Sequence, residues 1–247
     1  MEQAWDSFEL TRQEQLELIA VQVGLKSVLR LERPASTGQR IAAQMCRHGF
    51  ACVEAGFHLV PHHRHPLGDT FVSTVPGAAV GMQRGVYFVA LRSQLANAEA
   101  LAQIEARTPG SPEIGRRLGY PACCIAAYED IHLGSDWITT MLASTPPVRR
   151  GLAACNRLTR LFGEWTLLPD YYPCSFTCAV SAEWSSEIAR AASTNGMESY
   201  VEKAKLMLAL SIRVEEETIT LLSNIPEIVR HKSGIKGERI LTWENYP

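Results

Sequence analysis

The stretch that most constrains the fold is the segment at residues 85–91, GVYFVAL, in which every residue after the glycine is apolar. Side chains alternate between the two faces of a strand, so both faces of a strand formed here would be apolar. Such a strand is buried on both sides and does not lie at the edge of a sheet. The segment therefore predicts a central strand.

Other segments of the chain favour strands or helices around it. Short apolar runs typical of strands occur at residues 50–54, 56–60, 70–75 and 78–82. Helical spacing or helix-starting residues occur at residues 6–30, 39–47, 93–106, 112–118, 136–143 and 147–162. We predict a single α+β domain over residues 1–247. Its N-terminal helices and a small sheet would lie at about 1–92. The C-terminal half would be predominantly helical, and its part at about 93–225 contains two cysteine-bearing motifs, the cysteine boxes described below.

The sequence also predicts the structure of five further segments. We expect a short second helix at residues 25–31 and a loop at residues 32–38. The segment PHHRHPLGD at residues 61–69 holds two prolines and a glycine, which favours an irregular loop. Residues 197–223 are predicted to form one long amphipathic helix, and residues 239–243 a small strand.

Composition narrows the class of protein. The chain has a formal net charge of -2, with 46% hydrophobic and 20% charged residues, which is ordinary for a globular protein. This charge balance gives no case for nucleic acid or anionic membrane as a partner. The beginning, MEQAWDSFEL, is not typical of a secretory signal, and the longest apolar runs are too short to span a bilayer. We expect a cytoplasmic protein, and the sequence does not indicate its oligomeric state.

Two segments place cysteines where an irregular, proline-marked stretch turns into a helix. In IGRRLGYPACCIAAYED, Pro121 suits the first position of a helix, which puts Cys123 and Cys124 in or near its first turn. In LPDYYPCSFTCAVSAEWSS, Ser175 suits an N-cap, so that Cys178 falls in the first turn and Cys174 just outside it. The unpaired N–H groups and the dipole of a helix start favour thiolate over thiol.

The segments LGYPACC and PCSFTCAVS resemble a prokaryotic family of domains of unknown function (DUF483-like) that carries a GYP-x-CC box and, further along the chain, a PCS-x-x-C box. The resemblance extends over residues 87–192 at most. It implies that Cys123, Cys124, Cys174 and Cys178 form one site, but it implies no particular reaction.

Several chemistries could use these thiols. An iron–sulfur cluster needs three or four thiolates from different segments, and its negative charge suits helix starts. A zinc site needs similar ligands, but adjacent Cys123 and Cys124 fit it less well because neighbouring side chains rarely reach one ion. A metal-free nucleophilic or redox thiol pair is a further option, and small apolar residues in a helix-packing core are the plain alternative. We favour a bound metal or cluster, with iron–sulfur ahead of zinc.

A second group of possible ligands lies earlier in the chain, where histidines are dense between residues 48 and 65. A mononuclear non-haem iron site is possible there, although an exposed polar turn is the plainer interpretation of HHRH. His58, on an expected strand, is the best candidate to point into a site, and Glu54 could join it as an acid or base. Arg116, just before the CC box, could bind a carboxylate or phosphate, or it could be a solvated charge on a helix face.

The leading hypothesis is a bacterial, metal-dependent enzyme of the oxidoreductase or lyase type that acts on a small-molecule substrate. Its centre would be an iron–sulfur cluster on Cys123, Cys124, Cys174 and Cys178, acting in a redox or Lewis-acid role. A structural zinc or thiol-stapled interaction module is the alternative from a different class, with residues 197–223 docking a partner. No P-loop, G-x-G-x-x-G or G-x-S-x-G motif is present, so neither nucleotide hydrolysis nor serine hydrolase chemistry is expected.

Overall fold

The computed structural model describes residues 8–64, 70–76, 84–133, 166–167, 171–208, 211–214, 218–222, 230–232 and 239–241. The chain divides into two compact units. The first consists of Met1–His65 and Asp69–Tyr120, and the second of Pro66–Gly68 and Pro121–Pro247. The prediction of a single domain over residues 1–247 stays a prediction.

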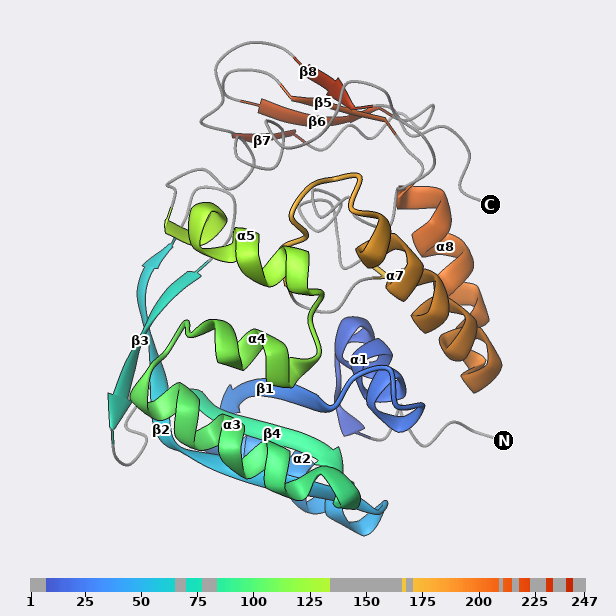
Figure 1. Ribbon diagram of the computed structural model, residues 1–247. Coiled ribbons are helices and arrows are strands. Elements are labelled where there is room, and N and C mark those ends of the chain that lie inside the picture. The colour runs from blue at the N-terminus through green and yellow to red at the C-terminus, as the bar shows by residue number, and fades with distance from the viewer. Residues whose placement is uncertain are drawn as a thin grey trace. The chain divides into compact units, whose positions relative to one another are not determined.

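The first unit is built on a four-stranded antiparallel sheet of order β1-β4-β2-β3. Its strands are β1 (Val28–Pro34), β2 (Phe50–Arg64), β3 (Thr70–Pro76) and β4 (Arg84–Leu91). Strand β4 lies between β1 and β2 and is buried from its second residue to its seventh (Figure 1). This confirms the central strand that the doubly apolar pattern predicts.

Helices supply apolar side chains to both faces of this sheet. On one face, α1 (Arg12–Gln22) and α2 (Ala35–Arg47) contribute Leu18 and Ile41 to a core that also holds Tyr87. On the other face, α3 (Leu95–Arg107) and α4 (Pro112–Leu118) contribute Leu101 and Leu118 to a core around Phe88. Successive residues of β4 thus enter opposite cores, as the alternation of a strand requires.

Local sequence signals explain where the helices begin and end. Thr11 and Glu14 form a capping box on α1, with the Thr11 hydroxyl accepting from the Glu14 amide at 3.2 Å and the Glu14 carboxylate accepting from the Thr11 amide at 2.8 Å. Helix α4 begins at Pro112 after the Ser111 cap and ends at Leu118, before Gly119, whose φ of 85° is left-handed. The predicted start and end of α4 are confirmed.

A buried ion pair lies close to the end of the first unit. The Lys26 ammonium binds the Glu17 carboxylate, and both residues are buried. The same ammonium lies 5.4 Å from the centroid of the Tyr120 ring. Tyr120 is the last residue of the first unit and comes two residues before Ala122, where the helix that carries Cys123 and Cys124 begins.

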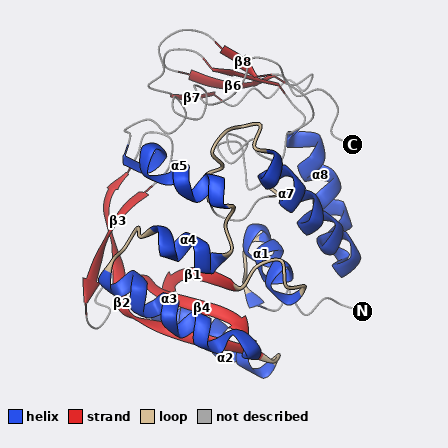
Figure 2. Ribbon diagram, viewed as in Figure 1, coloured by secondary structure: helices blue, strands red, loops and turns tan. Residues whose placement is uncertain are grey.

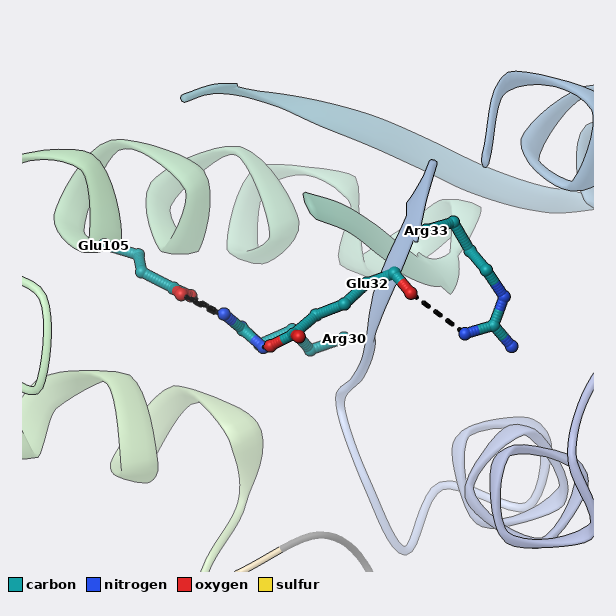
Figure 3. A network of polar contacts seen from close by, with 4 residues as sticks. All are labelled: Arg30, Glu32, Arg33 and Glu105. Atoms are coloured by element: carbon teal, nitrogen blue, oxygen red, sulfur yellow. Dashed lines mark hydrogen bonds and ion pairs between the residues drawn. The ribbon is translucent and has the colours of Figure 1, made fainter. Parts of the chain in front are cut away.

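A second polar network joins the edge strand β1 to helix α3 (Figure 3). The Arg30 Nε lies 3.0 Å from each Glu105 carboxylate oxygen, and the Arg30 guanidinium also binds Glu32. Arg33 donates to the Glu32 backbone carbonyl at 2.9 Å. Because Arg30 is fixed in planar, charged contacts, this side chain is structural.

Three predictions for the connecting segments are wrong in the first unit. Residues 25–31 were expected to be helical, but β1 begins within them at Val28 and pairs with β4 along its length. The expected loop at residues 32–38 is the end of β1 and the start of α2. Strand pairing overrides local helix preference in so short a run.

The third wrong prediction concerns the histidine segment. The irregular loop expected at residues 61–69 does not begin at Pro61, because β2 continues to Arg64. A register shift between Pro61 and His63 accommodates the proline, which a regular ladder would exclude. Residues 65–69 lie outside the described part of the chain.

The second unit contains helices α5 (Ala122–Leu133), α7 (Ala179–Ala192) and α8 (Glu198–Leu208), which Figure 2 shows with α7 and α8 side by side. It also has a second antiparallel sheet of order β7-β6-β5-β8. The strands are β5 (Ser211–Val214), β6 (Thr218–Leu222), β7 (Arg230–Lys232) and β8 (Arg239–Leu241). The α+β class with a sheet in the N-terminal half is confirmed, and this second sheet was not predicted.

The long helix predicted at residues 197–223 is wrong over its second half. Helix α8 ends at Leu208, and the β-branched residues that follow pair as β5 and β6. Asn195 and Gly196 leave helical geometry between α7 and α8 and so separate the two helices. The small strand expected near residue 239 is β8.

Expectations for residues 78–82, 136–143 and 147–162 lie outside the described residues. Within the described ranges, no helix has both the length and the apolar character that a bilayer crossing requires.

Candidate metal centre

The first pair of cysteines lies on the opening turn of α5. The carbonyl of Pro121 accepts from the backbone amides of Cys124 at 2.9 Å and Ile125 at 3.0 Å, which closes the first turn. Cys123 and Cys124 are the second and third residues of the helix. The helix begins one residue after Pro121, which was expected at its first position, and both cysteines lie in the first turn as predicted.

The second pair brackets a turn that leads into α7. The Cys178 amide donates to the Ser175 carbonyl at 3.3 Å, and the Ser175 hydroxyl accepts from the Thr177 amide at 3.3 Å. Helix α7 therefore begins at Ala179, with Cys178 at the N-cap position. The predicted cap at Ser175 is wrong because its hydroxyl caps the turn and not the helix.

The two pairs converge although Cys124 and Cys174 are 50 residues apart in the sequence. The sulfur atoms of Cys123, Cys124, Cys174 and Cys178 all lie within 4.8 Å of one another. Cys123 Sγ lies 3.8 Å from both Cys124 Sγ and Cys178 Sγ, and Cys124 Sγ lies 3.7 Å from Cys178 Sγ. Adjacent Cys123 and Cys124, which fit a single zinc ion less well by their spacing, thus both place their sulfurs in the cluster.

Polar groups contact two of the four sulfurs. The Ser181 hydroxyl donates to Cys178 Sγ at 3.2 Å and lies 3.3 Å from Cys124 Sγ. The backbone amide of Cys174 donates to Cys124 Sγ at 3.4 Å. Ser181 is completely buried, Cys124 and Cys178 are 2% and 6% exposed, and Cys123 is open to solvent. One side of the cluster is thus packed and hydrogen-bonded, and the other is accessible.

These contacts and burial shift the pKa values of the thiols in opposite directions. Hydrogen bonds from the Cys124 thiol and the Ser181 hydroxyl lower the pKa of Cys178 to about 4. The contact with Cys178, together with burial, raises the pKa of Cys124 above its ordinary value. Burial, followed by the charge of Cys178, raises the pKa of Cys174 to about 12. A metal ion binding here would meet one thiolate and displace protons from at least two thiols.

The four thiols can hold a metal ion. A tetrahedral ion with bonds of about 2.3 Å to sulfur places its ligand atoms about 3.8 Å apart. Three of the sulfur pairs have separations of 3.7–3.8 Å, which equal that edge within a tenth of an ångström.

Sequence reasoning missed Ser181, although it lies within the second cysteine box. It follows Cys178 by three residues, and residues three apart on a helix share a face. That spacing is the signal by which a partner for the sulfur could have been found.

The other predicted site residues belong to the first unit. His58 is buried on β2, and its Nδ1 has no hydrogen-bond partner among the described residues. Glu54 is exposed on the same strand and accepts from the Tyr87 hydroxyl at 3.3 Å, a contact that adds to burial in raising the pKa of Tyr87 to about 12. Arg116 lies on α4 in an exposed ion pair with Glu113 at 3.0 Å. Their roles in substrate binding or proton transfer stay predictions.

The remaining thiols of the first unit lie at the junction of α2 and β2. Cys46 is exposed near the end of α2, and Cys52 is half-buried on β2, where burial and then Cys46 raise its pKa. His48 packs its ring against Phe8, with 4.9 Å between the ring centroids. Among the described residues, only the four cysteines of the second unit form a cluster of metal-ligand type. The side chains of His62, His63 and His65 lie outside the described part of the structure.

Comparisons of the chain with protein-family models, curated proteins and solved structures give no match.

Proposed function

We propose that the chain binds one tetrahedral metal ion, zinc, through Cys123, Cys124, Cys174 and Cys178. The observation that carries the proposal is the separation of 3.7–3.8 Å within three sulfur pairs, which is the ligand spacing of a single ion. In a cluster, sulfurs bound to different iron atoms are further apart than sulfurs that share one ion.

Zinc suits this site because four thiolates in a tetrahedron are its common structural ligand set. A set of four protein ligands leaves no open position, so the ion would join the start of α5 to the turn before α7. Binding energy would then become folding energy for the second unit. The function is that of a metal-stabilised module.

The deciding experiment is metal and acid-labile sulfide analysis on protein purified without oxygen, followed by reconstitution with Co²⁺. We expect one zinc per chain, no sulfide, and a cobalt spectrum of a tetrahedral tetrathiolate site. The Cys178→Ala variant should lose the metal, and Cys46→Ala should keep it because Cys46 lies in the other unit. Metal retention by Cys178→Ala would refute the site.

The second candidate is the iron–sulfur enzyme expected from the sequence. The observation that favours it is the solvent access of Cys123 beside two helix starts, where an anionic cluster could meet a small-molecule substrate. In this candidate, His58, Glu54 and Arg116 keep their predicted roles in substrate binding or proton transfer. Iron with matching sulfide would select it over zinc, and iron without sulfide would select a mononuclear iron centre.

Kinship with the DUF483-like family is also a proposal, as is a cytoplasmic location. The kinship is supported by the two boxes that carry the resemblance, because their thiols lie together in one cluster. A reducing compartment is consistent with thiols held for a metal.

A further inference from the structure

We propose that Cys123 is the nucleophilic sulfur of the metal-bound site and that it accepts an alkyl group from a soft carbon electrophile. This inference rests on the proposed function, since it concerns a thiolate that is bound to the ion. It assigns to the site a transfer reaction in addition to its structural role.

Access distinguishes Cys123 from its neighbours. Cys123 is exposed, whereas Cys124 and Cys178 are buried and Cys174 is half-buried. An incoming electrophile must approach the sulfur along a free direction, so the exposed member of the set is the one it can reach.

Hydrogen bonding also distinguishes the two buried sulfurs from that of Cys123. Cys178 Sγ accepts from the Ser181 hydroxyl at 3.2 Å, and Cys124 Sγ accepts from the Cys174 amide at 3.4 Å. Cys123 Sγ lies 3.8 Å from the sulfurs of both Cys124 and Cys178, and it also interacts with the Cys174 thiol.

Such bonds affect the rate because a thiolate loses its charge when it is alkylated. A donor stabilises the charged ground state more than the transition state, so a charge-assisted hydrogen bond slows the attack by about tenfold or more. Cys123 is therefore less protected than Cys124 and Cys178 by access and by hydrogen bonding together, and less protected than half-buried Cys174 by access.

The step is a simple displacement. With iodoacetamide as the probe, a lone pair of Cys123 Sγ attacks the carbon that bears iodine. The sulfur–carbon bond forms, the carbon–iodine bond breaks, and iodide leaves with the bonding pair. No proton is released and nothing is oxidised, because the thiolate becomes a neutral thioether. The site would then hold the ion through three thiolates and one weaker thioether ligand.

The test is time-resolved peptide mapping of the zinc-loaded full chain with less than one equivalent of iodoacetamide. We expect Cys123 to be modified at least about tenfold faster than Cys124 or Cys178, and faster than half-buried Cys174. Exposed Cys46, in the other unit, serves as an internal reference thiol that binds no metal. In a parallel reaction, Cys123→Ser should lose this fast modification while Cys46 reacts as before.

The outcomes separate the two claims. First modification at another of the four cysteines, or at all of them together, would overturn the role of Cys123 while the bound zinc leaves the proposed function intact. A chain that binds no zinc, either as purified or after loading, would remove the proposed function and this inference with it. The wild-type map decides the matter even where Cys123→Ser fails to fold.

Discussion

Ser181 lies behind two of the four sulfurs and is completely buried. Its hydroxyl contacts both Cys178 and Cys124, so it influences a metal ion without binding it. Partners of this kind orient ligands and adjust their basicity. The same helix supplies a matched residue, because Ser185 is also completely buried but donates to the Leu167 carbonyl at 3.1 Å.

The Ser181→Ala variant should bind zinc about tenfold more weakly, because Cys178 loses its hydroxyl donor. Competition with a chromogenic chelator measures this loss. The Ser185→Ala variant removes an equally buried hydroxyl and should leave the affinity unchanged. Equal losses in the two variants would mean that the effect comes from packing and not from the sulfur contact.

Protons compete with the metal for the same sulfurs. Cys124 and Cys174, whose pKa values are raised, are protonated at neutral pH, whereas Cys178, with a pKa of about 4, is not. Zinc binding must release at least the protons of Cys124 and Cys174, so the affinity should rise with pH by about two log units per pH unit or more. Chelator competition at several pH values near neutrality checks the slope, and a flat profile would contradict it.

Most of the candidate site could be predicted from single residues. Four cysteines at two proline-marked helix starts favour a bound metal or cluster over core packing, and the family resemblance implies that they share one site. Adjacent Cys123 and Cys124 seemed unsuited to one ion, since their approach depends on side-chain rotamers that spacing does not reveal. The Ser175 cap failed because a serine can cap a turn as well as a helix.

At the scale of elements, α2 and β4 approach each other so closely that one position must be glycine. A Cβ atom added to Gly38 would lie 2.0 Å from Cε2 of the Tyr87 ring. That ring is buried, and its hydroxyl donates to the Ala35 carbonyl at 3.1 Å, so it cannot move aside easily. Helix α2 can therefore pack this closely on the central strand β4 only because Gly38 has no side chain.

The Gly38→Ala variant should lower the free energy of unfolding by about 2 kcal/mol, because overpacking outweighs the gain in helix propensity. Urea denaturation followed by circular dichroism measures the change. Gly56 on β2 has nothing within 4 Å of an added Cβ, so Gly56→Ala should stay within about 0.5 kcal/mol of wild type. A tolerated alanine at position 38 would show that the ring has room to shift.

Elements with strong local signals were predictable, and elements defined by distant pairing were not. The doubly apolar pattern of β4 and the serine, proline and glycine around α4 act within a few residues. Strand β1 owes its form to β4, some 60 residues away by the pairing of Val28 with Ala90. Strands β5 and β6 likewise depend on their mutual pairing and on β8.

At the scale of the whole molecule, metal removal should loosen one unit and leave the other intact. The ligands all belong to the second unit, and the β1–β4 sheet with its two cores belongs to the first. After zinc is chelated, amide hydrogen exchange should accelerate at the start of α5 and around Cys174–Cys178, while β4 keeps its protection. Equal acceleration in β4 would show that the two units unfold together.

The distance in sequence between the cysteine pairs also has a consequence for the newly made protein. Fifty residues separate Cys124 from Cys174, and at a synthesis rate of about 5–20 residues per second this is a delay of roughly 3–10 s. The described residues of the first unit have been made before Cys123 leaves the ribosome, so they can fold without metal. Cys123 and Cys124 are therefore made before Cys174 and Cys178. The ion can be fully coordinated only when the last of the four thiols has left the ribosome.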